Sequence, residues 1–300
     1  MAQTVTTSVA ASGDVLDYIA LLKPRVMSLV VFTGFAGLAV APGEMHPILA
    51  AVAVFCIALA SGAAGAINMW YDRDIDALME RTRNRPLPTG KIEPAEALSF
   101  GVILAAGAVM LMFLATNAVA AALLAAAVLF YVFVYTVWLK RRTSQNIVIG
   151  GAAGAFPPAI GWAAVTGHVG IEAIVMFLVI FFWTPPHFWA LALYRKGDYA
   201  TAGIPMLPVV RGGDATKRQM LFYTLLLAPL SMAPCFLGIA GWLLYGGAAI
   251  ILNAIFLMLA VAVMRDTTES SAKRMFGFSI FYLFALFAFL IADNSLARML

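Results

Sequence analysis

Residues 48–76 read ILAAVAVFCIALASGAAGAINMWYDRDID, an apolar run of membrane-spanning length that ends in polar and acidic side chains. About 20 apolar residues are enough for a helix to cross a bilayer. At the polar end, Asn68, Asp72 and Asp76 are spaced by four residues. At about 100° per residue, this spacing lines three oxygen-bearing side chains along one helical face. The stretch therefore predicts a spanning helix with a carboxylate stripe at one end.

The rest of the chain repeats the apolar pattern. Of its 300 residues, 63% are hydrophobic and only 11% are charged, against about 25% charged in soluble domains. Long apolar runs separated by short polar connections predict an all-α polytopic membrane protein with nine transmembrane helices. The expected spans are 26–42, 48–72, 95–115, 118–138, 145–165, 171–194, 219–240, 247–264 and 275–292.

Lysine and arginine positions predict the orientation, because positively charged connections resist translocation. Connections 77–94 and 195–218 are basic, whereas those around 44–47, 116–117, 166–170 and 242–246 contain no Lys or Arg. We expect a cytoplasmic N-terminus and a periplasmic C-terminus. The membrane orientation then accounts for the net charge of +4, which does not indicate nucleic-acid binding.

The first 20 residues lack the features of a signal or transit peptide. We therefore expect a bacterial inner (plasma) membrane as the location. The predicted organisation is a cytoplasmic segment at 1–25 and one transmembrane domain at 26–300. The two basic connections are longer than the others, and we expect them to cap a site as binding loops.

The carboxylate stripe suggests chemistry. A charge at membrane depth costs about 2.5–3.5 kcal/mol and persists mainly where it faces a polar cavity or serves a reaction. Hard oxygen ligands suit Mg²⁺, which bridges to substrate phosphates, and the arginines within 81–85 match phosphate oxygens. The pattern favours a site for a magnesium-chelated diphosphate over charges that merely mark the membrane interface.

A second group lies in the expected span at 171–194. His187, Tyr194 and Asp198 are seven and eleven residues apart, which returns them to within about 20° of one helical face. The other two histidines fall in outward connections. His187 is a candidate metal or heme ligand or proton-transfer group, and the alternative is an interhelical hydrogen bond.

Several motifs then agree in order along the chain. They are Asn68-x-x-x-Asp72-x-x-x-Asp76, RTRNRPLPTG at 81–90, NIVIGGAAGAFPP at 146–158, WTPPHFWALA at 183–192 and DYxxAGIPMLP at 198–208. With these motifs the chain resembles the intramembrane, UbiA-type prenyltransferase superfamily. Within that superfamily, the sequences of these motifs are most similar to those of the protoheme IX farnesyltransferases, or heme O synthases.

This resemblance implies transfer of farnesyl from farnesyl diphosphate to a vinyl group of heme B, with addition of water. The product would be heme O for terminal oxidases. It also implies a central active-site cavity that opens to the cytoplasmic side and Mg²⁺ as the cofactor. The lipid bilayer and a downstream heme A synthase are the implied partners.

Residue roles follow from the same resemblance. Asn68, Asp72, Asp76 and Asp198 are expected as metal ligands and catalytic residues. His187 and Tyr194 are also expected as catalytic residues, with His187 at the heme. Quinone-type members carry a second aspartate-rich motif where this chain has His187, Tyr194 and Asp198. The residues expected to bind the diphosphate are Arg83, Arg85, Lys91, Tyr135, Lys140, Arg142 and Lys196.

Two other functions compete with this one. An aromatic prenyltransferase acting on a quinone precursor would carry the same stripe. A secondary transporter would also show intramembrane polar groups and helices interrupted by proline. Transporters usually have paired repeats with sites at the midplane, whereas these acids cluster at one end and no second Asn-x-x-x-Asp-x-x-x-Asp occurs.

Overall fold

The computed structural model describes residues 13–299, so residues 1–12 of the expected N-terminal segment lie outside the described part. Eight helices are long and apolar enough to cross a membrane, and α1 (Val15–Leu21) with α2 (Pro24–Val40), bent by 55°, makes a ninth candidate. The others are α3 (Pro47–Tyr71), α5 (Pro94–Ala115), α6 (Ala118–Leu129) with η1 (Phe130–Leu139), α7 (Asn146–Thr166), α8 (Ile171–Tyr194), α11 (Gly212–Phe236), η2 (Trp242–Gly246) with α12 (Gly247–Arg265), and α13 (Ser270–Met299). The predicted all-α, multi-spanning membrane fold is confirmed, with eight spans, or the predicted nine if the bent pair α1 and α2 is one span.

Local chemistry sets several helix boundaries. Pro24, Pro47 and Pro94 each occupy the first helical position, where a fixed φ is favourable and no N–H is needed. The side chain of Asn117 caps α6 by accepting from the Ala120 N–H at 2.9 Å. α7 ends at Gly167, whose φ of 73° suits a glycine C-cap.

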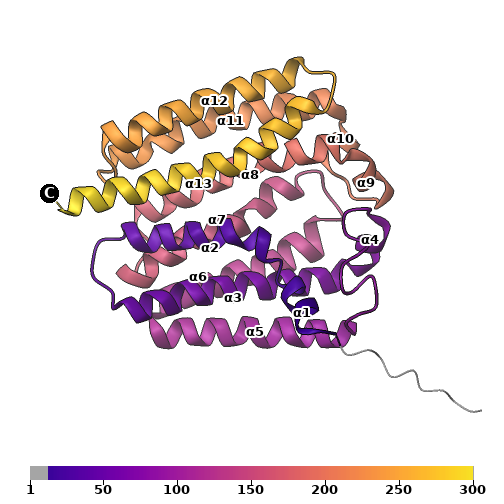
Figure 1. The fold of residues 1–300 in the computed structure, drawn as a ribbon, viewed down its shortest axis with the longest axis horizontal. Helices are drawn as coiled ribbons and strands as arrows, with labels where there is room; N and C mark the ends of the chain where they lie inside the picture. Colours follow the sequence, from indigo (N-terminus) through magenta and orange to yellow (C-terminus); the bar gives the residue numbers. More distant parts are fainter. Residues whose placement is uncertain (1–12, 300) are drawn as a thin grey trace, which may run out of the picture.

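Short helices gather at one end of the bundle, on the right in Figure 1. α4 (Arg73–Leu78) lies in the first basic connection, and α9 (Lys196–Thr201) and α10 (Leu207–Val210) lie in the second. We call this the basic end. The C-terminus lies at the other end, as expected for an odd number of spans (Figure 1).

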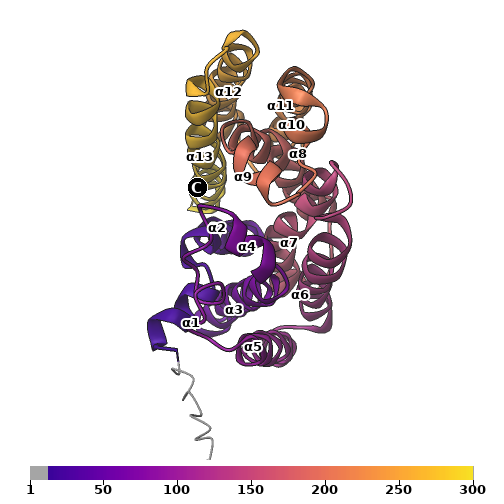
Figure 2. The same ribbon diagram turned by 90° about the vertical axis from the view of Figure 1, so that its right-hand side faces the viewer.

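Viewed from the basic end, the long helices curve around α4 and α9 (Figure 2). α2 packs against α3 and α7, α7 against α8, and α8 against α11 and α13. α13 returns to α2, so the first and last spans are neighbours. The helix carrying the carboxylate stripe and the helix carrying His187 therefore lie on opposite sides of α7.

Glycines permit the closest helix crossing, between α2 and α7. A Cβ at Gly37 would collide with the Pro158 carbonyl, and one at Gly161 would collide with the Gly34 carbonyl. Small residues at such crossings let membrane helices approach backbone to backbone. This contact holds α2 tightly against α7.

The last span is also tied to the first by a side chain. Arg298 donates to the carbonyl oxygens of Val40 and Ala41, at 3.1 and 2.8 Å. Those carbonyls belong to the C-terminal end of α2, where a cation is favourable. Arg298, the one basic residue outside the expected cytoplasmic set, thus has a structural role.

Candidate active site

The predicted stripe exists, although the helix that carries it ends within it. α3 stops at Asp72, and Asp76 lies in α4. Backbone hydrogen bonds from Asp72 N to Asn68 O (2.9 Å) and from Asp76 N to Asp72 O (2.8 Å) continue the four-residue register across the break. All three side chains are buried, with exposures of 4%, 1% and 2% along the sequence. We call Asn68, Asp72 and Asp76 the acid cluster.

Each member of the acid cluster has a basic partner. Lys23 Nζ donates to Asn68 Oδ1 at 2.8 Å, and Arg85 pairs with Asp76 Oδ2 at 2.7 Å. Lys140 pairs with Asp72 Oδ2, which also accepts from Asn68 Nδ2 at 2.7 Å. Because a lone buried carboxylate costs several kcal/mol, these cations make the burial possible.

The π-helical segment η1 delivers two of the cluster's contacts. Its Thr136 Oγ1 accepts from Asn68 Nδ2 at 3.1 Å, and Lys140 follows directly after its last turn. The Lys140 N–H bonds to Tyr135 O five residues back, at 2.9 Å. Wide turns of this kind frequently occur at functional sites. Tyr135 itself packs against Tyr131, with ring centroids 5.3 Å apart.

Lys23 reaches the cluster through an unusual backbone conformation. Among residues 13–299 it is the one non-glycine residue with positive φ, at 53°, in the bend between α1 and α2. Such a conformation is costly for a residue with a side chain and marks positions held by their surroundings. Here the bend aims the ammonium group at Asn68.

Arg141 braces the outside of the cluster. Its guanidinium donates twice to Asp74, both at 2.7 Å, and to the Tyr71 carbonyl at 3.1 Å, and it lies 3.5 Å from Asp72 Oδ1. The hydrogen bond from Arg141 lowers the pKa of Asp74. A hollow of about 420 Å³ adjoins these residues, lined by Trp70, Tyr71, Arg73, Asp74 and Arg141.

The remaining predicted diphosphate residues lie at the basic end but outside the cluster. Arg83, Arg142 and Lys196 are exposed. Lys91 is exposed as well and pairs with Asp17 at 3.1 Å. The structure thus brings Arg85 and Lys140 onto the acids and leaves these four cations at the surface around them.

Asp198 does not join the cluster as a third carboxylate. It lies in α9 with its side chain 17% exposed, 3.9 Å from Arg195. Within residues 13–299, no three His, Cys, Asp or Glu side chains converge as a metal-binding group. Tyr194 lies nearby, with Arg195 and Lys273 at 5.9 and 5.7 Å from its ring centroid.

His187 occupies a different environment on α8. Its Nδ1 lies 2.6 Å from the Ser279 hydroxyl of α13. Trp183 and Phe276 stack on the imidazole with centroid distances of 4.3 and 4.7 Å, and Phe188 meets it edge-on at 4.9 Å. The interhelical hydrogen bond expected as the alternative is present. We call these five residues the His187 site.

Four contributing residues were missed as site residues from the sequence. Lys23 and Arg141 lie at span ends, where basic residues are expected for orientation alone, although Lys23 directly precedes Pro24 and so falls at a predictable helix start. No sequence feature indicates Thr136 or Ser279 as site residues, because each contacts a residue that is distant in the sequence. Only the folded contacts identify them.

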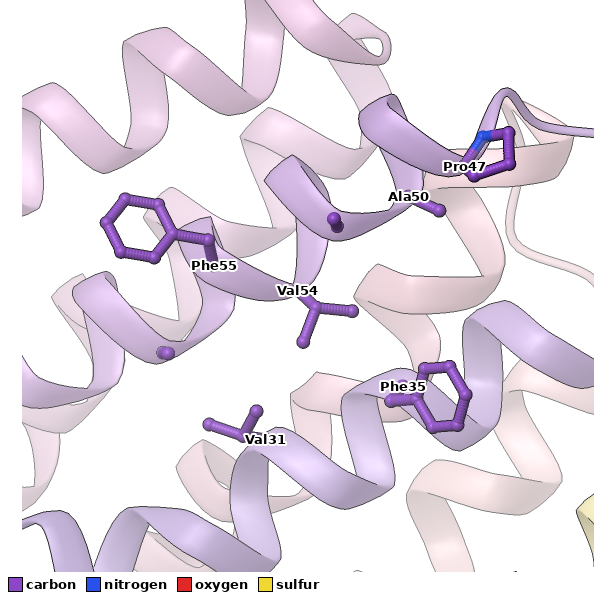
Figure 3. Close-up of a pocket in the computed structure, with 8 residues that line it drawn as sticks. Val31, Phe35, Pro47, Ala50, Val54 and Phe55 are labelled. Carbon is purple, nitrogen blue, oxygen red and sulfur yellow. The ribbon is translucent and has the colours of Figure 1, made fainter.

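A second hollow lies between α2 and α3, on the side away from the basic end (Figure 3). It measures about 560 Å³ and is lined by the apolar residues Val31, Phe35, Pro47, Ala50, Ala51, Val54, Phe55 and Ala58. Asn68 lies about 15 Å further along α3 than Ala58, at 1.5 Å per residue. The hollow suits hydrocarbon and is separate from the acid cluster.

Comparison with known proteins identifies the family of this fold and site. The model of the UbiA prenyltransferase family matches residues 30–289. The chain belongs to the UbiA prenyltransferase family. Its relatives include protoheme IX farnesyltransferases from Acidiphilium cryptum strain JF-5 (58% identity over 93% of this chain and 90% of the relative) and Parvibaculum lavamentivorans strain DS-1 (58%, 95% and 90%).

Solved UbiA-type structures share the fold. Digeranylgeranylglyceryl phosphate synthase matches with a TM-score of 0.77 at 20% identity, covering 93% of this chain and 98% of the other. A UbiA homolog from Archaeoglobus fulgidus, bound to GPP and Mg²⁺, matches with a TM-score of 0.64 at 17% identity, covering 93% and 99%. The chain is thus a multi-pass prenyltransferase of the UbiA family.

Proposed function

We propose that this UbiA-family enzyme transfers the farnesyl group of farnesyl diphosphate to a vinyl group of heme B, with addition of water, to make heme O. The buried, cation-paired acid cluster carries the donor half of this proposal. Relatives that are 55–58% identical and named protoheme IX farnesyltransferase support the acceptor half. A quinone-precursor prenyltransferase shares the first feature but not the second.

The acid cluster fits Mg²⁺ by its donor chemistry, because it gathers an amide oxygen and two carboxylates in a buried place next to basic side chains. Asn68, Asp72 and Asp76 would hold the ion, with Asp198 as a further ligand from α9. When bound, Mg²⁺ supplies positive charge to the diphosphate oxygens.

The basic side chains of the site then act on the leaving group. Arg85 and Lys140, which pair with Asp76 and Asp72, bind phosphate oxygens. Arg83, Lys91, Arg142, Lys196 and the hydroxyl of Tyr135 complete the diphosphate-binding set. The bond between farnesyl C1 and the diphosphate oxygen breaks with both electrons leaving on oxygen, and donors placed where charge develops lower that barrier most.

The acceptor half is assigned to α8 and α13. The vinyl carbon attacks the allylic cation, and water adds to the neighbouring carbon with release of a proton. The aromatic residues around His187 exclude other water from the cation until that attack. His187 binds the heme iron. Tyr194 lies further along α8, closer to the basic end.

The charge distribution supports an orientation and a location. The basic end faces the cytoplasm of a bacterial cell from its inner membrane, with the N-terminus inside and the C-terminus in the periplasm. Segments 77–94 and 195–218 of the single transmembrane domain cap a cavity that opens to the cytoplasm. A heme A synthase downstream is the expected consumer of the product.

The decisive experiment offers the purified protein farnesyl diphosphate with either heme B or 4-hydroxybenzoate and weighs the products by mass spectrometry. We expect farnesylated, hydrated heme and release of diphosphate. Prenylated 4-hydroxybenzoate alone would replace the proposal with the quinone-precursor activity. Absence of diphosphate release with either acceptor would overturn the enzymatic assignment of the acid cluster.

A further inference from the structure

Ser279 of α13 has a hydrogen-bonding arrangement that determines the chemistry of His187. The Ser279 hydroxyl lies 2.6 Å from the Phe276 carbonyl oxygen and 2.6 Å from His187 Nδ1. A hydroxyl has one proton to donate, and a carbonyl oxygen can only accept. The Ser279 proton therefore goes to Phe276, and Ser279 accepts a proton from His187 Nδ1.

This fixes the tautomer of the imidazole. With Nδ1 protonated, neutral His187 carries its lone pair on Nε2. Within residues 13–299 the only side-chain hydrogen bond of His187 is the one at Nδ1, so Nε2 has no hydrogen-bond partner. The stacked rings of Trp183 and Phe276 hold the imidazole plane. The ring is thus locked in both tautomer and orientation.

We infer that Ser279 is a positioning residue that presents the His187 Nε2 lone pair to the heme iron of the acceptor. The inference rests on the proposed function and adds a residue 92 positions away from the histidine. Histidines that bind metals commonly donate their other N–H to an oxygen, which orients the ring and raises its basicity. Removing such a partner typically lowers metal affinity by about 10- to 100-fold.

The chain supplies a matched control in Ser231 of α11. Ser231 is also fully buried, donates to the carbonyl three residues back (Ala228, 2.8 Å) and accepts from a side chain of another helix (Asn253 Nδ2, 2.7 Å). In place of the imidazole that bonds to Ser279, the partner of Ser231 is an amide. Ser231→Ala therefore reproduces the packing loss without touching His187.

The test measures binding of hemin and of metal-free protoporphyrin IX to full-length protein in detergent. We expect Ser279→Ala to weaken hemin binding about 10-fold and to shift the Soret band. Protoporphyrin binding should stay within about two-fold because no ligand bond forms without iron. Ser231→Ala should change neither affinity, and Ser279→Thr, which keeps the hydroxyl, should restore hemin binding.

The outcomes separate this inference from the proposed function. If wild-type protein makes farnesylated heme while Ser279→Ala binds hemin as Ser231→Ala does, the positioning role is wrong and the function stands. An equal loss for hemin and protoporphyrin would show a packing effect and would also overturn the role. If wild-type protein makes no farnesylated heme, the proposed function fails whatever the serine variants do.

Discussion

At the end of α3, buried acids are surrounded by cations, whereas on α8 the buried imidazole of His187 is surrounded by aromatic rings. The acid cluster takes its partners from Lys23, Arg85 and Lys140, in three separate connections at the basic end. The His187 site takes its partners from one neighbouring helix, α13, and from its own. One region is arranged to neutralise and exchange charge, and the other to hold a neutral ring still.

The difference indicates a division of labour between donor and acceptor. The cations that pair with the acid cluster can instead pair with the oxygens of a diphosphate. Each cation then has an anionic partner both before and after the diphosphate binds. A ring fixed between aromatic faces offers no such exchange, but it presents one atom in a constant direction. If this comparison is right, damage to each region should affect a different substrate.

Asp72→Ala should have the largest effect. Removing the carboxylate leaves Lys140 without its partner and takes away a metal ligand, so we expect turnover to fall at least about 100-fold. Hemin binding should be unchanged. Diphosphate release and hemin titration on the same preparation measure both, with Glu80→Ala, at an exposed position of the same connection, as the control. Loss of hemin binding in Asp72→Ala would break the division between the regions.

His187→Ala should have the opposite effect and impair the acceptor without impairing the donor. We expect hemin affinity to fall by about 100-fold, the upper end of the range for changes around a metal ligand. Binding of farnesyl diphosphate should persist. His168→Ala, in an exposed connection, is the control. Hemin spectra and affinity in His187→Ala that match wild type would remove the ligand role and reduce His187 to a structural link.

Lys23→Met should sharpen the description of the donor region. The substitution removes one charged hydrogen bond to Asn68, worth about 1.5–3 kcal/mol, and we expect KM for farnesyl diphosphate to rise about 10-fold. Arg25→Met, two residues away at an exposed position, should change KM by less than about two-fold. Equal effects of the two variants would mean that general positive charge, and not the contact, matters.

Gly161→Ala tests the close crossing of α2 and α7. The added Cβ collides with the Gly34 carbonyl, so α2 and α7 must separate, at a cost of about 1–3 kcal/mol. We expect a lower Tm in detergent and impaired use of both substrates. Gly154→Ala on the same helix, where a Cβ meets nothing within 4 Å, should leave Tm unchanged. A Tm for Gly161→Ala equal to that of the control would contradict the tight crossing.

Arg298→Ala should have the smallest effect. It removes two hydrogen bonds at the end of α2, worth about 1 kcal/mol in all at an exposed site. Thermal unfolding should begin slightly earlier, while both substrate affinities stay at wild-type values. An altered KM would show that the far end communicates with the site, which the comparison of the two regions does not predict.

The sequence predicts the spans and the acid cluster because both rest on local periodicity. Apolar length locates α3, and the four-residue spacing survives the helix break at Asp72 because the backbone bonds continue through it. Partner identity is not local. The π-helical turns of η1 that bring Thr136 to Asn68, and the bend that aims Lys23, depend on tertiary packing.

The same limit applies to the second group. Helical spacing predicts His187, Tyr194 and Asp198 on one face, but α8 ends at Tyr194 and Asp198 lies in the separate helix α9. Nothing in spacing indicated that His187 would bond to Ser279. The role of Asp198 as a metal ligand stays a prediction, as do the roles of the exposed cations around the acid cluster.

The return of α13 to α2 has a consequence for biosynthesis. The side chains that contact the acid cluster lie between residues 23 and 141, so these contacts can form while the ribosome is still making the second half of the chain. Phe276 and Ser279 belong to the last span. The contacts around His187 can therefore form only when translation is nearly over, well after the contacts of the acid cluster.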